Sequence, residues 1–291
     1  MTSTLPSLMR FTTAAHRVAG DVIGTYSTSF GMATTLLGSR HRQHVRNIYA
    51  LVRVADEIVD GVAREAGLSL QEQSQALARY KEETHRAMET GYSTDLVIHA
   101  FARTAREAAI DESLTGPFFD SMRTDLETST FQLDDHARYV YGSAEVVGLM
   151  CLRVFLRNEQ VSAEQDAILT HGARQLGAAF QNINFLRDLA EDSDRLGRDY
   201  LGGGEDLTDA RRAEWVQTIR AQLDDARASL PLLPRDCQIA VRSAYELFAA
   251  LLRRLGTVPV EDLHHSRTRV SNPVKLSLVA RAALTTCRKG S

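Results

Sequence analysis

Cysteine, proline and long apolar runs are scarce in this sequence of 291 residues. The three cysteines lie far apart with no Cys-x-x-Cys pair, which argues against a disulfide or zinc framework and favours a reducing compartment. The longest apolar run, VVGLMCLRVFL, is short and contains Arg153. The N-terminal segment also lacks the apolar core of a signal peptide. We therefore expect a cytoplasmic protein without a membrane span or anchor.

An excess of charge of one sign is also lacking. The net charge is −3, and the basic residues are scattered rather than gathered in one segment. This pattern argues against a nucleic-acid surface. With 44% hydrophobic residues, a chain of this length can bury a large core.

Strand signals are nearly absent, and helical signals dominate. Long stretches rich in Ala, Leu, Arg and Glu place apolar residues at i, i+3 and i+4, and Ser162 to Gln165 form a capping-box pattern. Only six prolines occur. We expect loops at five of them: Pro117, Pro231, Pro234, Pro259 and Pro273. The sequence predicts an all-α fold with one domain over residues 1–291.

The stretch YALVRVADEIVDG, residues 49–61, combines an apolar helical pattern with two aspartates. At about 100° per residue, one narrow stripe holds Tyr49, Arg53, Asp56 and Asp60. Apolar side chains cover most of the remaining circumference, and a helix of this kind is buried. Buried carboxylates are costly unless cations neutralise them, so we expect the two aspartates to face a cavity.

A second stretch, FQNINFLRDLAEDSD, repeats the pattern more than a hundred residues later. Gln181, Asn184, Asp188 and Asp192 share one stripe, and Phe and Leu side chains surround it. Because the two stretches are far apart in the sequence, nothing local explains the repetition.

Divalent cation binding is the chemistry that fits this pattern. Mg²⁺ prefers oxygen ligands, and two facing pairs of aspartates could hold two or three ions against a diphosphate. Arg53 and Arg187 lie beside the stripes and could contact phosphate. Without a nucleotide-binding motif, an apolar pit behind the diphosphate indicates an isoprenoid substrate. The ordinary alternative is that each Asp-x-x-x-Asp lies on a solvated helix face.

Other candidate groups have weaker patterns. Glu57 and Glu191 fall beside the stripes, where we interpret them as structural or outer ligands. His41, His44 and the pair His264–His265 could bind metal, but no acidic or cysteine partner has suitable spacing, so we interpret them as surface histidines.

These motifs resemble the squalene/phytoene synthase family of head-to-head prenyltransferases. YSTSF (residues 26–30), the two aspartate segments and SMRTDLE (residues 121–127) are similar to family segments along most of the chain. Near the C-terminus, Tyr245 and SRTRVSNPVK resemble a tyrosine and a basic segment that hold diphosphate. The fold implied is an isoprenoid-synthase helical bundle around a central apolar cavity.

The resemblance also implies roles for individual residues. Mg²⁺ ligands would be Asp56, Asp60, Asp188 and Asp192, with Tyr49 and Arg53 completing the catalytic set. Substrate-binding residues would be Ser27, Ser29, Phe30, Gln181, Asn184, Arg187, Tyr200, Tyr245, Arg267 and Arg269, with Lys275 a further candidate. The implied reaction joins two farnesyl or geranylgeranyl diphosphates through a cyclopropylcarbinyl diphosphate to a C30 or C40 polyene.

Two departures from the family pattern affect the expected product. Ser121 and Thr124 replace a glycine and a methionine, and Glu145 stands where many members carry glycine in a segment that lines the pocket. The alternatives are a terpene synthase that cyclises one prenyl diphosphate and a catalytically silent helical binding subunit. NADPH is not expected. The apolar product predicts transient peripheral membrane contact, and the sequence leaves the oligomeric state open.

Overall fold

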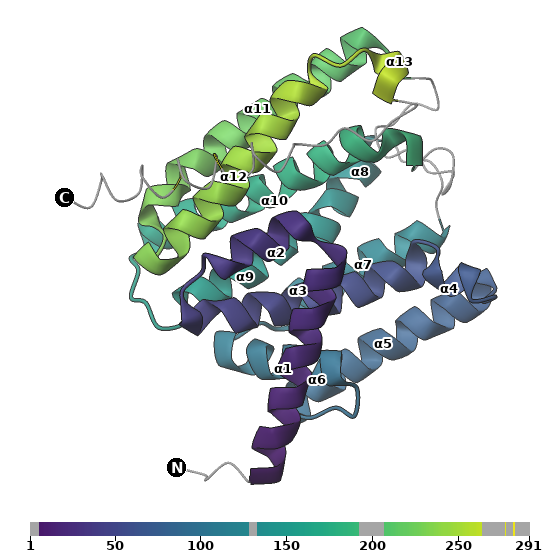
Figure 1. The fold of residues 1–291 in the computed structure, drawn as a ribbon, viewed down its shortest axis with the longest axis vertical. Coiled ribbons are helices and arrows are strands. Elements are labelled where there is room, and N and C mark those ends of the chain that lie inside the picture. Colours follow the sequence, from purple (N-terminus) through teal and green to yellow (C-terminus); the bar gives the residue numbers. More distant parts are fainter. Residues whose placement is uncertain (1–5, 128–132, 192–206, 264–276, 278–281, 283–291) are drawn as a thin grey trace.

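The computed structural model describes residues 6–127, 133–191 and 207–263, together with residues 277 and 282. Within these residues every regular element is helical, which confirms the predicted all-α fold (Figure 1). The first elements are α1 (Pro6–Tyr26), α2 (Thr28–Thr35), α3 (Ser39–Val59), α4 (Val62–Glu65), α5 (Leu70–Thr90), α6 (Leu96–Ala108) and α7 (Glu112–Glu127). They are followed by α8 (Leu133–Val140), a π-helical turn (Tyr141–Glu145), α9 (Val146–Leu156), α10 (Ala163–Glu191), α11 (Asp209–Ser229), a 3₁₀ turn (Leu230–Leu232), α12 (Arg235–Leu255) and α13 (Val260–Leu263).

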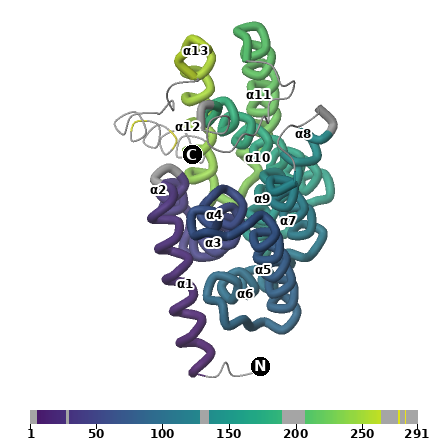
Figure 2. Tube along the Cα trace, turned by 90° about the vertical axis from the view of Figure 1, so that its right-hand side faces the viewer, coloured from purple at the N-terminus to yellow at the C-terminus, as the bar shows by residue number. Residues whose placement is uncertain are grey.

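Helices α3 and α10 organise the bundle. The central helix α3 packs against α1, α5, α6, α7 and α9, whereas α10 packs along α9, α11 and α12. Figures 1 and 2 both show α11 and α12 at one end of the molecule and α5 and α6 at the other. The short helix α2 packs against both α3 and α12, so it connects the two halves.

The surroundings of α3 follow from its sequence. Ile48, Leu51, Ala55 and Val59 are at most 4% exposed, and no residue from 41 to 60 is in the exposed class. The helix is therefore enclosed on all sides, as the apolar pattern predicts, and Asp56 and Asp60 are partly buried.

Side-chain caps fix where several helices begin. Ser69 and Glu72 form a reciprocal capping box at α5, and Asp95 accepts hydrogen bonds from two backbone N–H groups of α6. At α10, Ser162 Oγ accepts from Gln165 N and Gln165 Oε1 accepts from Ser162 N, both at 3.2 Å. This is the capping box that the sequence predicts.

One predicted loop is wrong. Pro117 lies inside α7 rather than between helices. A proline in a helix costs one backbone hydrogen bond and crowds the preceding turn, and the packing of α7 on its neighbours outweighs this local preference.

Helix α8, the π-turn and α9 form one continuous apolar helix. The helix Asp135–Leu156 has 22 residues, and its most apolar 18-residue window has a mean hydropathy of 1.4, so by length and composition alone it could cross a membrane. The run VVGLMCLRVFL alone did not indicate a helix of this length, because the helix extends well beyond it. The stretch packs against α7 and α10, and core helices of water-soluble proteins also meet this criterion.

Candidate active site

The first aspartate motif lies at the C-terminal end of α3. Asp56 is in the last turn and Asp60 is the C-cap, whose N–H donates to the Asp56 carbonyl at 2.7 Å. Gly61 then adopts a φ of 118°, which is easy only for glycine, and the chain turns into α4. Both aspartates are half-buried. No basic residue occupies the last turn, although a helix C-terminus carries negative partial charge and favours cations.

Arg53 lies one turn before Asp56. Its guanidinium pairs with Glu57 and lies 4.4 Å from the centre of the Tyr26 ring. Its Nε is buried and has no hydrogen-bond partner among the described residues. The pair with Glu57 confirms that this acid is engaged beside the stripe, and the unsatisfied N–H suits an anionic ligand.

Tyr49 lies in the middle of α3, where Phe30 of α2 approaches it. Burial, as the largest cause, raises the pKa of Tyr49 above its usual value. Ser27 is the N-cap of α2, where its Oγ accepts from Phe30 N at 3.1 Å. The Tyr49 hydroxyl is therefore protonated at neutral pH and available as a donor. The side chain of Ser29 is outside the described residues.

The second motif lies in the last three turns of α10. Gln181, Asn184, Arg187 and Asp188 are all half-buried, and Arg187 Nε donates to Asp188 Oδ1 at 2.9 Å. Asn184 Oδ1 is buried and has no hydrogen-bond partner in the part of the chain that the structure describes. The last turn of α10 again has no basic residue. Asp192 and Tyr200 lie outside the described residues, as do Arg267, Arg269, Lys275 and the histidines 264 and 265.

An aromatic cluster joins the two motif helices. The ring of Phe30 on α2 lies 6.4 Å from Tyr49 on α3 and 6.0 Å from Phe180 on α10, centre to centre. Phe248 on α12 lies 5.6 Å from Phe30 and stacks on Phe180 at 3.8 Å. The structure thus places side chains next to both motifs in one apolar group. The sequence pointed to Phe180 as part of this cluster only through its position beside Gln181, and it gave no indication of Phe248.

Tyr245 lies one turn before Phe248 on α12. It is 8% exposed, and burial raises its pKa above the usual value. The charged groups nearest to it include Arg227 and Asp224 of α11. No described contact joins Tyr245 to either aspartate motif, so its diphosphate role stays a prediction.

The two departures from the family pattern have partners in the structure. Ser121 is buried, and its Oγ donates to the Tyr139 carbonyl at 3.1 Å. Glu145 ends the π-turn, and its Oε2 accepts from Arg174 Nε at 2.7 Å. The acid at position 145 is therefore paired with a cation.

A second group has ligand-type side chains but does not fit a metal. His41, Asp236 and Cys237 place one ligand atom each within 4.8 Å of one another. However, Arg157 donates to His41 Nδ1 at 3.0 Å, and Arg40 donates to both oxygens of Asp236 at 2.7 and 3.0 Å. Since two guanidinium groups already occupy the acceptors, we interpret this group as an ion-pair cluster.

The predicted surface position of two histidines is wrong. His41 is fully buried, and the side chain of His44 is 16% exposed. The His44 ring is hydrogen-bonded to Thr104 at 3.0 Å. Polar partners on neighbouring helices allow the two rings to be buried, and the sequence gives no sign of those partners.

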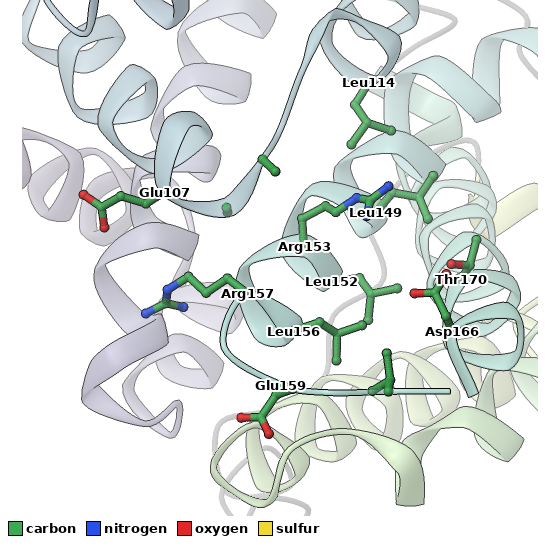
Figure 3. Close-up of a pocket in the computed structure, with 13 residues that line it drawn as sticks. Glu107, Leu114, Leu149, Leu152, Arg153, Leu156, Arg157, Glu159, Asp166 and Thr170 are labelled. Carbon is green, nitrogen blue, oxygen red and sulfur yellow. The ribbon is translucent and has the colours of Figure 1, made fainter. Parts of the chain in front are cut away.

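A surface hollow of about 340 Å³ lies elsewhere in the molecule (Figure 3). Leu149, Leu152 and Leu156 of α9 form its apolar wall, and Asp166 and Thr170 of α10 lie opposite. None of the predicted site residues that the structure describes lines it. The predicted central cavity next to the aspartates stays a prediction.

Comparison with known proteins identifies the family. Residues 23–273 match the family described as squalene/phytoene synthase. A 15-cis-phytoene synthase of Enterobacter agglomerans is 30% identical over 88% of this chain and 91% of its own length. Phytoene synthase 1 of Arabidopsis thaliana is 30% identical over 91% of this chain, which spans 64% of that longer protein.

Solved structures show the same fold. A dehydrosqualene synthase bound to a ligand has a TM-score of 0.76 with 22% identity, and the match covers 95% of this chain and 98% of the other. The resemblance drawn from the two aspartate motifs is confirmed. The chain belongs to the squalene/phytoene synthase family and is a prenyltransferase.

Proposed function

We propose that this chain condenses two allylic prenyl diphosphates head to head, with Mg²⁺, to a phytoene-type polyene. Membership of the family supports the general reaction, head-to-head condensation of prenyl diphosphates. The observation that carries the finer proposal is the chemistry at the two motif helices. Asp56 and Asp60 are half-buried at the end of α3, Asp188 is half-buried near the end of α10, and the aromatic cluster joins the two helices.

The residues present fit Mg²⁺. Asp56, Asp60 and Asp188 offer hard oxygen ligands, and the unsatisfied Oδ1 of Asn184 is a further oxygen of the same kind. Together with Asp192 they would hold two or three ions. When bound, the ions would neutralise the negative charge that develops on the departing diphosphate.

The chain's own groups would bind and orient the substrates. Arg53 would donate its unsatisfied Nε–H to a phosphate oxygen, and Arg187 would contribute a second guanidinium. The Tyr49 hydroxyl, whose pKa is raised by burial, would donate to the same diphosphate. The rings of Phe30 and Tyr49 would stabilise the allylic cation through their faces and exclude water together with Phe180 and Phe248.

The proposed chemistry has two ionisations. In the first, the C–O bond of one substrate breaks and diphosphate leaves with the electron pair. The double bond of the second substrate then attacks, and loss of a proton gives a cyclopropylcarbinyl diphosphate. In the second, that diphosphate leaves, the ring opens by rearrangement, and loss of another proton ends the reaction without a reductant. NADPH is therefore not expected, since only a squalene-type product needs hydride.

Farnesyl and geranylgeranyl diphosphate are the candidate substrates. The purified protein would be incubated with each of them, with Mg²⁺ or with excess EDTA, followed by hydrocarbon analysis and diphosphate measurement. We expect a C30 or C40 polyene and two diphosphates per product, both dependent on Mg²⁺. A monomeric cyclic terpene would favour the terpene-synthase alternative, and no Mg²⁺-dependent diphosphate release would overturn the enzymatic proposal.

The apolar product favours release at a membrane surface. We therefore propose a cytoplasmic protein with transient peripheral membrane contact. Co-sedimentation with phospholipid vesicles would test this, and recovery of the protein only in the supernatant would contradict it.

A further inference from the structure

A single cation of α10 contacts both ends of the π-turn. Arg174 Nε donates to Glu145 Oε2 at 2.7 Å, and its guanidinium carbon lies 5.3 Å from the centre of the Tyr141 ring. Tyr141 and Glu145 are the first and last residues of the turn. The Glu145 side chain is only 14% exposed and that of Arg174 is 48% exposed. The pair is therefore partly withdrawn from solvent, and it restrains the turn from one side.

The π-turn is also enclosed by backbone contacts. A Cβ at Gly177 of α10 would lie 2.6 Å from the Ala144 carbonyl oxygen and 3.0 Å from Glu145 Cα. On the opposite side, a Cβ at Gly142 would collide with Ser121 Oγ and the Pro117 carbonyl of α7. The turn therefore fits one register between α7 and α10, with no room to slide.

A π-turn contains one residue more than an α-helical turn and is less stable, and it occurs often at functional sites. When one of its restraints is lost, the turn can shift toward α-helical hydrogen bonding. Complete conversion would rotate the two flanking segments relative to each other by about 100°, and the backbone contacts limit the change to a small part of that. Here the flanking segments are α8 and α9, and both pack on α10.

The affected part of α10 carries the second aspartate motif. Tyr139 and His136 of α8 lie 6.1 and 5.9 Å from the Phe185 ring, centre to centre. Phe185 follows Asn184 directly, and Gly177 precedes Phe180 by about one turn. The π-turn thus determines how α8 supports the segment from Phe180 to Asp188.

We propose that Glu145 and Arg174 are positioning residues for the second aspartate motif. The pair holds the π-turn, the π-turn places α8 against Phe185, and this contact orients Asn184 and Asp188 toward the substrate diphosphate. The inference rests on the proposed function. It also gives a role to the acid at position 145, which replaces a glycine of the resembling family pattern.

Four variants test the pair. Glu145→Ala and Arg174→Ala remove it, Glu145→Gln keeps an oxygen acceptor for Arg174, and the double variant Glu145→Arg/Arg174→Glu reverses the charges. Arg86→Ala is the matched control, because the Arg86 side chain is also 48% exposed and pairs with Glu83 at 2.6 Å far along the chain from both motifs. Diphosphate release would be measured over ranges of prenyl diphosphate and Mg²⁺.

We expect the two alanine variants to raise KM, and the Mg²⁺ concentration for half-maximal rate, by about tenfold, because small displacements of ligands are costly. Glu145→Gln, the charge-reversed variant and Arg86→Ala should stay within about threefold of the parent. Unchanged KM and Mg²⁺ dependence in both alanine variants, with the parent active, would overturn the positioning role and leave the proposed function intact.

Binding of inorganic pyrophosphate with Mg²⁺, followed by calorimetry, gives a readout that needs no turnover. If the parent protein binds pyrophosphate but releases none from prenyl substrates, the proposed function fails. In that case, weaker pyrophosphate binding by the two alanine variants, and not by the others, still supports the positioning role. Equal pyrophosphate binding by all variants overturns the positioning role. If the parent does not bind Mg²⁺-pyrophosphate, both proposals fail. If an alanine variant does not fold, Glu145→Gln and the charge-reversed variant test the positioning role instead. Both are expected to bind pyrophosphate as the parent does, so loss of pyrophosphate binding in both contradicts the proposal.

Discussion

Asp56→Asn separates the proposed metal role of the first motif from its structural role. Asp56 lies in the last turn of α3, half-buried, and the substitution keeps its shape while removing the charge. Loss of one metal-binding carboxylate should cost about 3 to 5 kcal/mol of transition-state stabilisation, which is about 10²- to 10⁴-fold in rate. The free energy of unfolding without Mg²⁺ should change by less than about 1 kcal/mol, because the helix C-terminus disfavours the negative charge that is removed.

Glu57 provides the control within the same turn. Its carboxylate pairs with Arg53, an i, i+4 contact worth about 0.5 kcal/mol in an isolated helix, so Glu57→Gln should lower the rate less than about tenfold. Diphosphate release would be measured over a range of Mg²⁺ concentrations, with circular dichroism and thermal unfolding on the same samples. The reasoning is refuted if Asp56→Asn turns over at the parent rate, or if Glu57→Gln loses as much activity as Asp56→Asn.

Three further predictions concern stability and the aromatic cluster. Burial, as the largest cause, lowers the pKa of His44 and of His136 to about 4. Unfolded histidines therefore bind protons between about pH 6.5 and 4 while these two stay neutral. The free energy of unfolding should therefore fall by about 2 kcal/mol per ring as the pH decreases through that window. Equal free energies of unfolding from denaturant titrations at pH 7 and 4.5 would contradict this. Gly142→Ala should cost about 2 kcal/mol, because its Cβ would collide with α7. Gly116→Ala, with nothing within 4 Å, should be neutral or stabilising; equal melting temperatures for the two would be inconsistent with the packing described. Phe248→Leu removes the ring that stacks on Phe180. We expect it to lower the rate of diphosphate release at temperatures well below its melting temperature, where the variant is still folded. If activity is lost only where the variant unfolds, Phe248 serves core packing alone.

The helical fold could be predicted because local and tertiary preferences agree. The capping box at Ser162 and the apolar circumference of α3 are set by side chains within one helix, so the sequence shows them directly. Pro117 inside α7 and the π-turn at Tyr141–Glu145 depend on packing between helices. A single sequence contains no signal for contacts of that kind.

The candidate site divides in the same way. Asp56 and Asp60 are evident because helical spacing brings them to one stripe of α3, and Asn184 and Asp188 are evident for the same reason on α10. Phe248 and Arg174 are not evident, because each acts through a residue on another helix. The burial of His41 was missed for the same reason, since Arg157 lies more than a hundred positions away along the chain.

The placement of the acids gives the strongest physical argument for a cation at this site. Asp56 and Asp60 lie at a helix C-terminus that is enclosed by other elements and has no basic residue in its last turn. Each carboxylate at such an end costs about 0.3 to 1 kcal/mol against the helix dipole, and partial burial adds to that cost. The second motif also lies at the C-terminal end of its helix, α10, where Arg187 pairs with Asp188. In the proposed site, a bound divalent cation would turn the unfavourable field at the end of α3 into binding energy, and the diphosphate of a prenyl substrate would supply the remaining oxygen ligands.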